Sequence, residues 1–249
     1  IAATPAELAQ LQWLYQAKTD HITIIPPGVD TSRFYPIPKD EAKEVIGVPT
    51  DHKMLLFVGR IEPLKGLDVL IEAIGRYCED PKKHMGDKKL FLAVIGGDPE
   101  ESPEKISAEM ARVQTLPAKY GINDVVTFLG KRDQNTLPYY YSAAEAVVVP
   151  SHYESFGMVA LEAMACGAPV VASQVGGLAF LVQDGVTGFT VPSGEPEALC
   201  GRLKALIDDR DLRRKMGEAA IIFAQQYAWE NITERMIKVY KTAIAEKGS

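Results

Sequence analysis

The sequence has few of the residues that build disulfide frameworks or metal sites. Its 249 residues include four histidines and three cysteines, Cys78, Cys166 and Cys200. There is no CxxC pair, and the histidines have no spacing that would bind zinc. An odd, sparse set of cysteines is typical of reduced thiols, so we expect a cytoplasmic protein without a disulfide scaffold, a metal or another cofactor.

Positive charge and long apolar runs are also scarce. Lys and Arg total 27 against 33 Asp and Glu, for a formal net charge of −6. This balance disfavours a nucleic-acid-binding surface and means that any anion site is local. No apolar run is long enough to cross a bilayer, and the opening IAATPAEL lacks the basic segment and apolar core of a signal peptide. Because the sequence starts without Met, we expect a piece of a longer protein.

Enough apolar residues are present for a sizeable core, since 47% of the chain is hydrophobic. Short apolar runs alternate with helical patterns. The expected strands cover residues 21–26, 54–58, 90–95, 125–129, 146–149, 169–172 and 187–191. The expected helices cover about 5–15, 39–46, 67–77, 103–120, 134–143, 157–166, 178–183, 195–207, 210–226 and 229–245. This alternation predicts an α/β fold with a doubly wound, Rossmann-like parallel sheet.

The stretch 150–167, PSHYESFGMVALEAMACG, combines a polar loop with a helix. We expect the helix to begin at Gly157 and to end at Gly167. Amide groups at a helix start just past a strand end can bind an anion. Glu162 would lie beside that anion, and a carboxylate can accept hydrogen bonds from two neighbouring hydroxyls. The stretch therefore suggests a nucleotide, although solvated glutamates on a packed helix would give the same pattern.

Two cations lie in the segment 59–66, GRIEPLKG, between an expected strand end and a helix start. Arg60 offers a planar fork and Lys65 a mobile point charge, and both suit a pyrophosphate. Taken alone, the segment is explained more simply by two solvated surface cations. The carboxyl ends of parallel strands share one edge of a sheet, so the second anion site at Gly157 favours a common ligand site.

With these residues assembled, the chain resembles the C-terminal, donor-binding half of a retaining glycosyltransferase of the GT-B fold. The similarity is to the large group 1 (GT4) family, which includes sucrose-phosphate synthases, bacterial mannosyltransferases and the mycothiol-pathway N-acetylglucosaminyltransferase. The spacing Glu154-x7-Glu162 is the signature of this family. The matching segments span nearly the whole chain, at residues 24–30, 55–73, 126–131, 150–173 and 175–191.

The resemblance implies a role for each matching residue. Arg60 and Lys65 would bind the donor diphosphate and stabilise the leaving group. Glu154 would contact the hydroxyls of the donor sugar, and Glu162 the ribose diol. The remaining donor contacts, largely from the main chain, would come from Gly59, Lys131, Arg132, Ser155, Phe156, Gly157, Met158 and Val159. Such enzymes need no divalent metal, because cations and a helix end neutralise the departing diphosphate.

The resemblance also implies an organisation into three parts. Residues 1–20 would be the end of an N-terminal domain with a linking helix, 21–228 the donor domain, and 229–249 a helix that crosses back. The N-terminal domain would bind the acceptor and is not among these residues, so we expect this chain alone to bind a nucleotide-sugar but to transfer little. The expected activity of the parent is hexosyl transfer from a UDP-sugar, as in sucrose-phosphate synthase. GDP- and ADP-sugar enzymes share these motifs, and peripheral membrane contact of the parent stays open.

One segment departs from the family pattern, and two other hypotheses stay open. The family often has GGxxE after its sixth strand, but here Gly176-Gly177-Leu178-Ala179 is followed by Phe180. The change would alter a contact near the donor or have no effect. An enzyme similar to a UDP-sugar 2-epimerase fits the ESFG and GRIEPLKG segments less well. The second hypothesis is a non-catalytic nucleotide-binding or scaffold domain. The intact charged residues of the site argue against it, because such a domain has no need to keep them.

Overall fold

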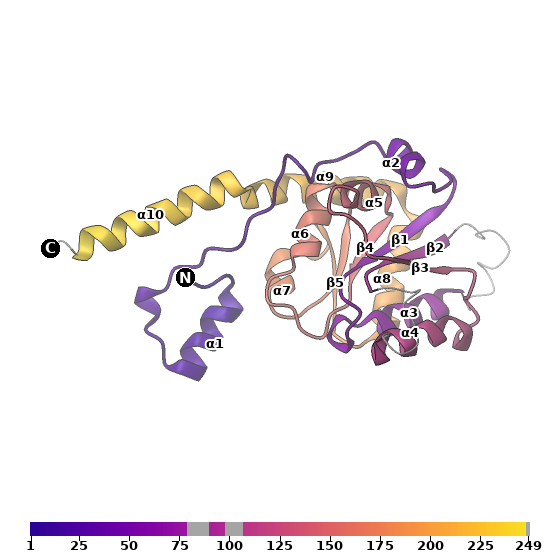
Figure 1. Cartoon of the computed structure of the whole chain (residues 1–249), viewed down its shortest axis with the longest axis horizontal. Coiled ribbons are helices and arrows are strands. Elements are labelled where there is room, and N and C mark those ends of the chain that lie inside the picture. Colours follow the sequence, from indigo (N-terminus) through magenta and orange to yellow (C-terminus); the bar gives the residue numbers. More distant parts are fainter. Residues whose placement is uncertain (79–89, 98–106, 248–249) are drawn as a thin grey trace.

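The structure, a computed structural model, describes residues 1–78, 90–97 and 107–247. Most of the chain forms a three-layer α/β/α lobe, from which two helices and a linking segment project (Figure 1). The N- and C-terminal ends both lie on the side of these projecting helices. No helix in the described ranges combines the length and the apolar character needed to cross a bilayer.

Six parallel strands form the central sheet, in the order β3-β2-β1-β4-β5-β6. They are β1 (Lys53–Val58), β2 (Leu90–Ile95), β3 (Val126–Gly130), β4 (Ala146–Val149), β5 (Val170–Ser173) and β6 (Gly188–Val191). All four residues of β4, AVVV, are buried, as expected for a parallel strand covered on both faces. The doubly wound sheet that the sequence predicts is confirmed.

Helices cover both faces of the sheet, each over its own apolar core. One face carries α3 (Leu67–Cys78), α4 (Ala108–Lys119) and α8 (Pro196–Asp208). The other carries α2 (Lys39–Val45), α5 (Leu137–Ala143), α6 (Met158–Ala165), α7 (Leu178–Leu181) and α9 (Arg210–Ala224). The short 3-10 turns are η1 (Thr19–His21), η2 (Pro63–Lys65) and η3 (Gln225–Tyr227). The crossovers through α3 and α4 thus run over one face, and those through α5, α6 and α7 run over the other.

The two projecting helices are α1 (Pro5–Tyr15) and α10 (Trp229–Lys247). α1 begins as predicted, because the hydroxyl of Thr4 accepts a hydrogen bond from the amide of Glu7 at 3.0 Å. None of its residues is buried. In α10, Ile232 is buried in the core, whereas Tyr240 is 58% exposed.

The expected strand at 21–26 is wrong. His21 belongs to η1, and the segment then makes one parallel bridge, between Ile24 and Ala2. β-branched residues form a strand only where a neighbour supplies a hydrogen-bonding ladder, and prolines 26 and 27 have no amide to donate. Residues 98–105, expected as a loop, lie outside the described residues, as does the start of the helix expected over 103–120.

A buried carboxylate ties together the amino edge of the sheet. Glu145, directly before β4, is contacted by Lys39 Nζ at 3.0 Å, Lys43 Nζ at 3.6 Å and Arg213 Nε at 2.6 Å. The lysines come from α2 and the arginine from α9, so one carboxylate joins two helices to the sheet. Burial raises the pKa of Glu145, but the charges of Lys39 and Arg213 outweigh it and hold the pKa below its ordinary value.

We expect Glu145→Gln to lower the free energy of unfolding by about 3–5 kcal/mol, because buried cations lose their countercharge. Urea unfolding followed by circular dichroism measures the change. Glu218→Gln, which removes an exposed partner of Arg214, is the control and should cost less than about 1 kcal/mol. Because the pKa of Glu145 is lowered, its contribution is present at neutral pH and is lost as the pH falls below 4.5. Equal losses in the two variants would contradict this role.

Candidate functional site

The strand order reverses between β1 and β4. The chain builds outward from β1 to β2 and β3 and then returns to place β4 on the other side of β1. In open parallel sheets, ligands bind beyond the carboxyl ends of the strands at such a reversal. The segment 59–66 follows β1, and the segment 150–157 follows β4. The fold therefore brings the two motifs found in the sequence to the same place.

An ion pair joins these two loops. Lys65 Nζ lies 2.7 Å from Oε2 of Glu154, and the two side chains are 22% and 17% exposed. The loops lie backbone against backbone, because a Cβ at Gly66 would overlap the carbonyl oxygen of Pro150. Gly66 also has a φ of 65°, in the left-handed region. Glycine at this position thus sets the distance across which Lys65 reaches Glu154.

Helix α6 begins directly after the second loop. Gly157 is its N-cap, with a φ of 109°, and no side chain caps the first turn. The amides of Met158 and Val159 belong to the turn that has no intrahelical acceptor, at the positive end of the helix dipole. The side chains of these two residues are partly buried and pack against the core, which leaves their amides at the helix start. This geometry suits an anion.

The segment after β5 supports the loop that carries Glu154. The amide of Gly177 donates to the carbonyl oxygen of Glu154 at 3.0 Å, and a Cβ at Gly176 would overlap the same oxygen. Phe156 is buried in the core, so its contribution to a site is limited to its backbone. Phe180, at the departure from the family pattern, lies on α7 and is 51% exposed.

Glu162 lies on α6, and its carboxylate meets a tyrosine from α5. The hydroxyl of Tyr141, a fully buried residue, donates to Oε2 of Glu162 at 2.8 Å. Burial raises the pKa of Glu162, while this hydrogen bond and the charge of Arg33 act in the opposite direction. Burial and the nearby carboxylate also raise the pKa of Tyr141 well above its ordinary value, so the phenol stays protonated and remains a donor.

Two residues at this site were not found from the sequence. Tyr141 is one of three consecutive tyrosines in α5, and nothing in their spacing distinguishes it. Arg33 follows a turn closed by Asp30, and its Nη1 donates to Oε1 of Gln134 at 2.9 Å. Both contacts join segments about 20 to 100 residues apart in the chain, so only the fold reveals them.

The structure does not bring all the predicted site residues together. The side chain of Arg60 is 76% exposed. It pairs with Glu62 at 2.6 Å and not with Glu154, the partner of Lys65. Lys131 and Arg132 follow β3 and are exposed; Arg132 donates to the carbonyl oxygen of Lys131 and to the hydroxyl of Tyr140. Ser155 is exposed. The main chain of Gly59 is engaged by the sheet, since its amide donates to the carbonyl oxygen of residue 95.

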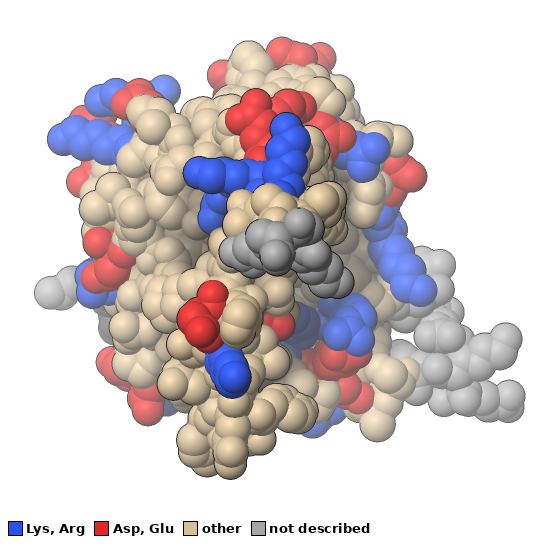
Figure 2. Space-filling view, turned by 90° about the vertical axis from the view of Figure 1, so that its left-hand side faces the viewer, with Lys and Arg blue, Asp and Glu red and all other residues tan. Residues whose placement is uncertain are grey.

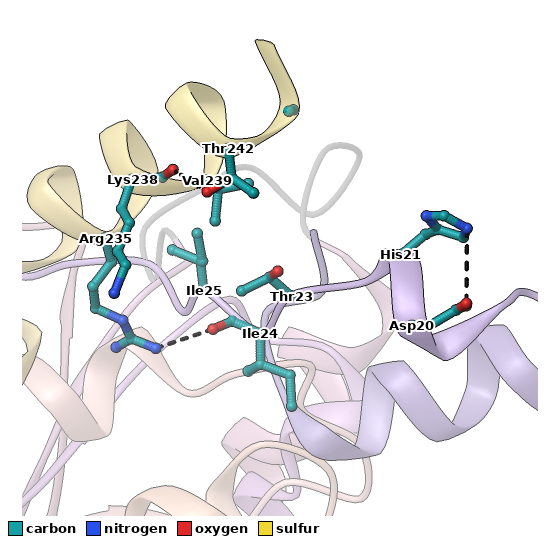
Figure 3. Close-up of a pocket in the computed structure, with 10 residues that line it drawn as sticks. Asp20, His21, Thr23, Ile24, Ile25, Arg235, Lys238, Val239 and Thr242 are labelled. Atoms are coloured by element: carbon teal, nitrogen blue, oxygen red, sulfur yellow. Dashed lines mark hydrogen bonds and ion pairs between the residues drawn. The ribbon is translucent and has the colours of Figure 1, made fainter. Parts of the chain in front are cut away.

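A hollow of about 760 Å³ lies elsewhere, between residues 20–25 and α10. Arg235 and Lys238 face Thr23 and Ile25 across it, and Nη2 of Arg235 donates to the carbonyl oxygen of Ile24 at 3.0 Å (Figure 3). Its residues come from the linking segment and the projecting helix, not from the carboxyl edge of the sheet. The hollow is therefore separate from the site built by the loops.

Residues 38–223 match the family described as glycosyl transferases group 1. The chain belongs to this family. It is 39% identical, over 247 residues, to the D-inositol 3-phosphate glycosyltransferase of Acidothermus cellulolyticus, covering 99% of this chain and 54% of that protein. It therefore spans about half the length of the curated relatives that it matches.

Solved structures of other proteins share the fold. Sucrose-phosphate synthase from Thermosynechococcus elongatus superposes with a TM-score of 0.86 at 35% identity, covering 98% of this chain and 58% of that one. Anabaena Alr3699/HepE in complex with UDP-glucose gives a TM-score of 0.81 at 24% identity, covering 97% and 63%. The chain thus corresponds to the C-terminal domain of group 1 (GT4) glycosyltransferases, and the predicted family and fold are confirmed.

We expect Glu162→Gln to raise the melting temperature of the free protein. Because the folded-state pKa of Glu162 is raised, ionisation costs stability as the pH rises above 4.5. A neutral amide avoids this cost and can still accept from Tyr141. Each kcal/mol gained should add about 2–4 °C, measured by calorimetry at pH 7.

The control for this variant is Glu72→Gln. Glu72 also accepts a tyrosine hydrogen bond, from Tyr120 at 3.0 Å, but its hydrogen bond with Arg76 lowers its pKa. The control should therefore gain no stability. A lower melting temperature for Glu162→Gln than for the wild-type protein would contradict the conclusion that ionisation of Glu162 lowers the stability of the fold.

Proposed function

We propose that this domain binds the donor of a retaining glycosyltransferase and that the donor is a UDP-sugar. The observation that carries the proposal is the joint position of three groups at the strand reversal. These are the Lys65–Glu154 ion pair, the uncapped start of α6 and the carboxylate of Glu162. A cation beside free helix amides suits a diphosphate, and an acceptor-only carboxylate suits the ribose diol.

In this proposal the diphosphate lies between Lys65 and the first amides of α6. Both are fixed before the donor arrives, so they stabilise the charge of the leaving group without reorganisation. Arg60 would exchange Glu62 for the diphosphate, which its exposed side chain allows. Glu154 would use its second oxygen for hydroxyls of the donor sugar while Lys65 holds the first.

The proposed chemistry breaks the bond between the anomeric carbon and the diphosphate oxygen, and the electron pair stays on the diphosphate. The acceptor oxygen forms its bond to the same carbon on the same face, and its proton passes to an oxygen of the departing diphosphate. The residues of this chain hold and neutralise the leaving group in this step. We also propose that the donor sugar is a hexose. We place the reaction in the cytoplasm because all three cysteines are free thiols.

We further propose that α1 and α10 dock on an acceptor-binding N-terminal domain of the parent protein. Large apolar side chains are exposed on α1 at Trp13 and Tyr15 and on α10 at Ile237, Tyr240 and Ile244. On the side from which these helices project, charges of both signs alternate with uncharged surface (Figure 2). Such a mixed surface is typical of a contact between domains. In this division residues 1–20 and 229–249 flank a donor domain at 21–228.

The donor base is tested by calorimetric titration of this chain with UDP, GDP and ADP in the presence of EDTA. We expect UDP to bind most tightly. Base recognition through the main chain near Lys131 and Arg132 would distinguish uracil from the larger purines. Tighter binding of GDP or ADP would replace the donor proposal. Binding of none of the three would overturn the proposed function.

Lys65→Met should weaken the binding of UDP by about ten- to a hundredfold, because charged hydrogen bonds to the diphosphate are lost. Uridine, which has no phosphate, should bind the variant and the wild-type protein alike. Lys215→Met, at an exposed position of α9, is the matched control and should bind UDP as the wild type does. An equal loss for UDP and uridine would assign Lys65 a structural role instead.

A further inference from the structure

The hydroxyl of Tyr141 is a polar group placed inside an apolar core. Tyr141 has no exposed surface, and its ring lies 6.1 Å from that of Phe34 at an angle of 56°. A hydroxyl in such surroundings is costly unless it has a hydrogen-bonding partner. The partner here is Oε2 of Glu162 at 2.8 Å. Phenylalanine would fill the same space without that requirement, so the hydroxyl calls for an explanation other than packing.

Helix α5 holds Tyr141 in place from its far end. Ser142 accepts a hydrogen bond from the amide of Ile37 at 3.1 Å, and Lys39 Nζ donates to the carbonyl oxygen of Ala144 at 2.9 Å. These contacts fix the end of α5 to the first residue of α2 and to the segment just before it. The helix that carries the tyrosine is therefore anchored by contacts that do not involve Glu162, and the buried ring packs in the core.

Glu162, in contrast, is a flexible side chain that reaches from α6 toward the site. The hydrogen bond from Tyr141 occupies Oε2, and in the described ranges no hydrogen bond to Oε1 is found. Fixing one oxygen fixes the direction of the other, because the carboxylate is planar. A carboxylate ordered before binding spares the ligand the cost of ordering it.

We propose that Tyr141 is a positioning residue for nucleotide selectivity: its hydroxyl holds Glu162 so that Oε1 accepts from the ribose hydroxyls. The inference rests on the proposed contact between Glu162 and the ribose. It assigns the preference for a ribonucleotide over a deoxyribonucleotide to a buried pair rather than to Glu162 alone. Burial raises the pKa of Glu162, whereas the Tyr141 hydrogen bond and the charge of Arg33 both lower it. Arg33 and Tyr141 therefore both favour the ionised carboxylate.

The test is the ratio of two affinities, for a nucleoside diphosphate and for its 2′-deoxy form. The nucleotide is whichever of UDP, GDP and ADP binds the wild-type chain best, and titration calorimetry gives both constants. We expect the wild-type protein to favour the ribonucleotide by about tenfold or more, and Glu162→Gln to reduce that ratio toward one. Tyr141→Phe should reduce the ratio by about three- to tenfold, with a smaller change in the affinity for the deoxy form.

Two further proteins separate positioning from packing. Tyr120→Phe removes a similar tyrosine–glutamate hydrogen bond, to Glu72 on the opposite face of the sheet, and should keep the wild-type ratio. 3-Fluorotyrosine at position 141 retains both ring and hydroxyl, and should also keep the ratio. The 3-fluorotyrosine protein serves as a folded comparison if Tyr141→Phe melts below the assay temperature. If it lost the preference for the ribonucleotide, that result would contradict the inference.

The outcomes distinguish this inference from the function on which it rests. A wild-type ratio that Glu162→Gln abolishes but Tyr141→Phe leaves unchanged would overturn the role of Tyr141 alone. A wild-type ratio near one would overturn the ribose contact of Glu162, and the inference with it. A fall in both affinities by the same factor in Tyr141→Phe would show that the hydroxyl supports the fold and not the selectivity.

Discussion

The site depends on loops that lie backbone against backbone at the carboxyl edge of the sheet. Side chains at Gly66 and Gly176 would overlap the carbonyl oxygens of Pro150 and Glu154. Without these glycines the three loops would move apart by the width of a side chain. Lys65 would then no longer reach Glu154, and the start of α6 would no longer face the cation. The close approach therefore converts separate strand ends into one site.

The same residue type serves opposite purposes at the two edges of the sheet. At the amino edge, Glu145 is surrounded by three cations, which lower its pKa and bind helices to the core. At the carboxyl edge, Glu162 is partly buried with a neutral tyrosine as its donor, and its pKa is raised. Glu145 thus stabilises the fold, whereas in our proposal Glu162 keeps hydrogen-bonding capacity for a ligand at a cost in stability. Sites built for binding commonly show this trade.

Much of the fold could be predicted from the sequence, because the buried strands are short apolar runs and glycines lie in the loops that follow them. The prediction of a strand at 21–26 was wrong for a physical reason. Residues 22–25 have the composition of a strand, but in the described part of the chain their one bridge is between Ile24 and Ala2. Lys65 and Glu154 could be placed on one edge from the topology alone. Their pairing could not, because it depends on the loop conformations that Gly66 permits.

Tyr141 marks the limit of reading the chain alone. Nothing in the run LPYYYSA tells which tyrosine faces α6, since that depends on where α5 begins. The sequence predicted a helix start at residue 134, and the structure places it at Leu137. Arg60 lies in the segment after β1, and its ion pair with Glu62 is likewise visible only in the folded chain.

The most direct test of the account is an experimental structure of this chain with UDP bound. The account predicts the diphosphate between Lys65 and the first turn of α6, with both ribose hydroxyls within hydrogen-bonding distance of Glu162. Arg60 should have left Glu62 for the diphosphate. A nucleotide bound in the hollow between residues 20–25 and α10, or one whose ribose faces away from Glu162, would contradict it.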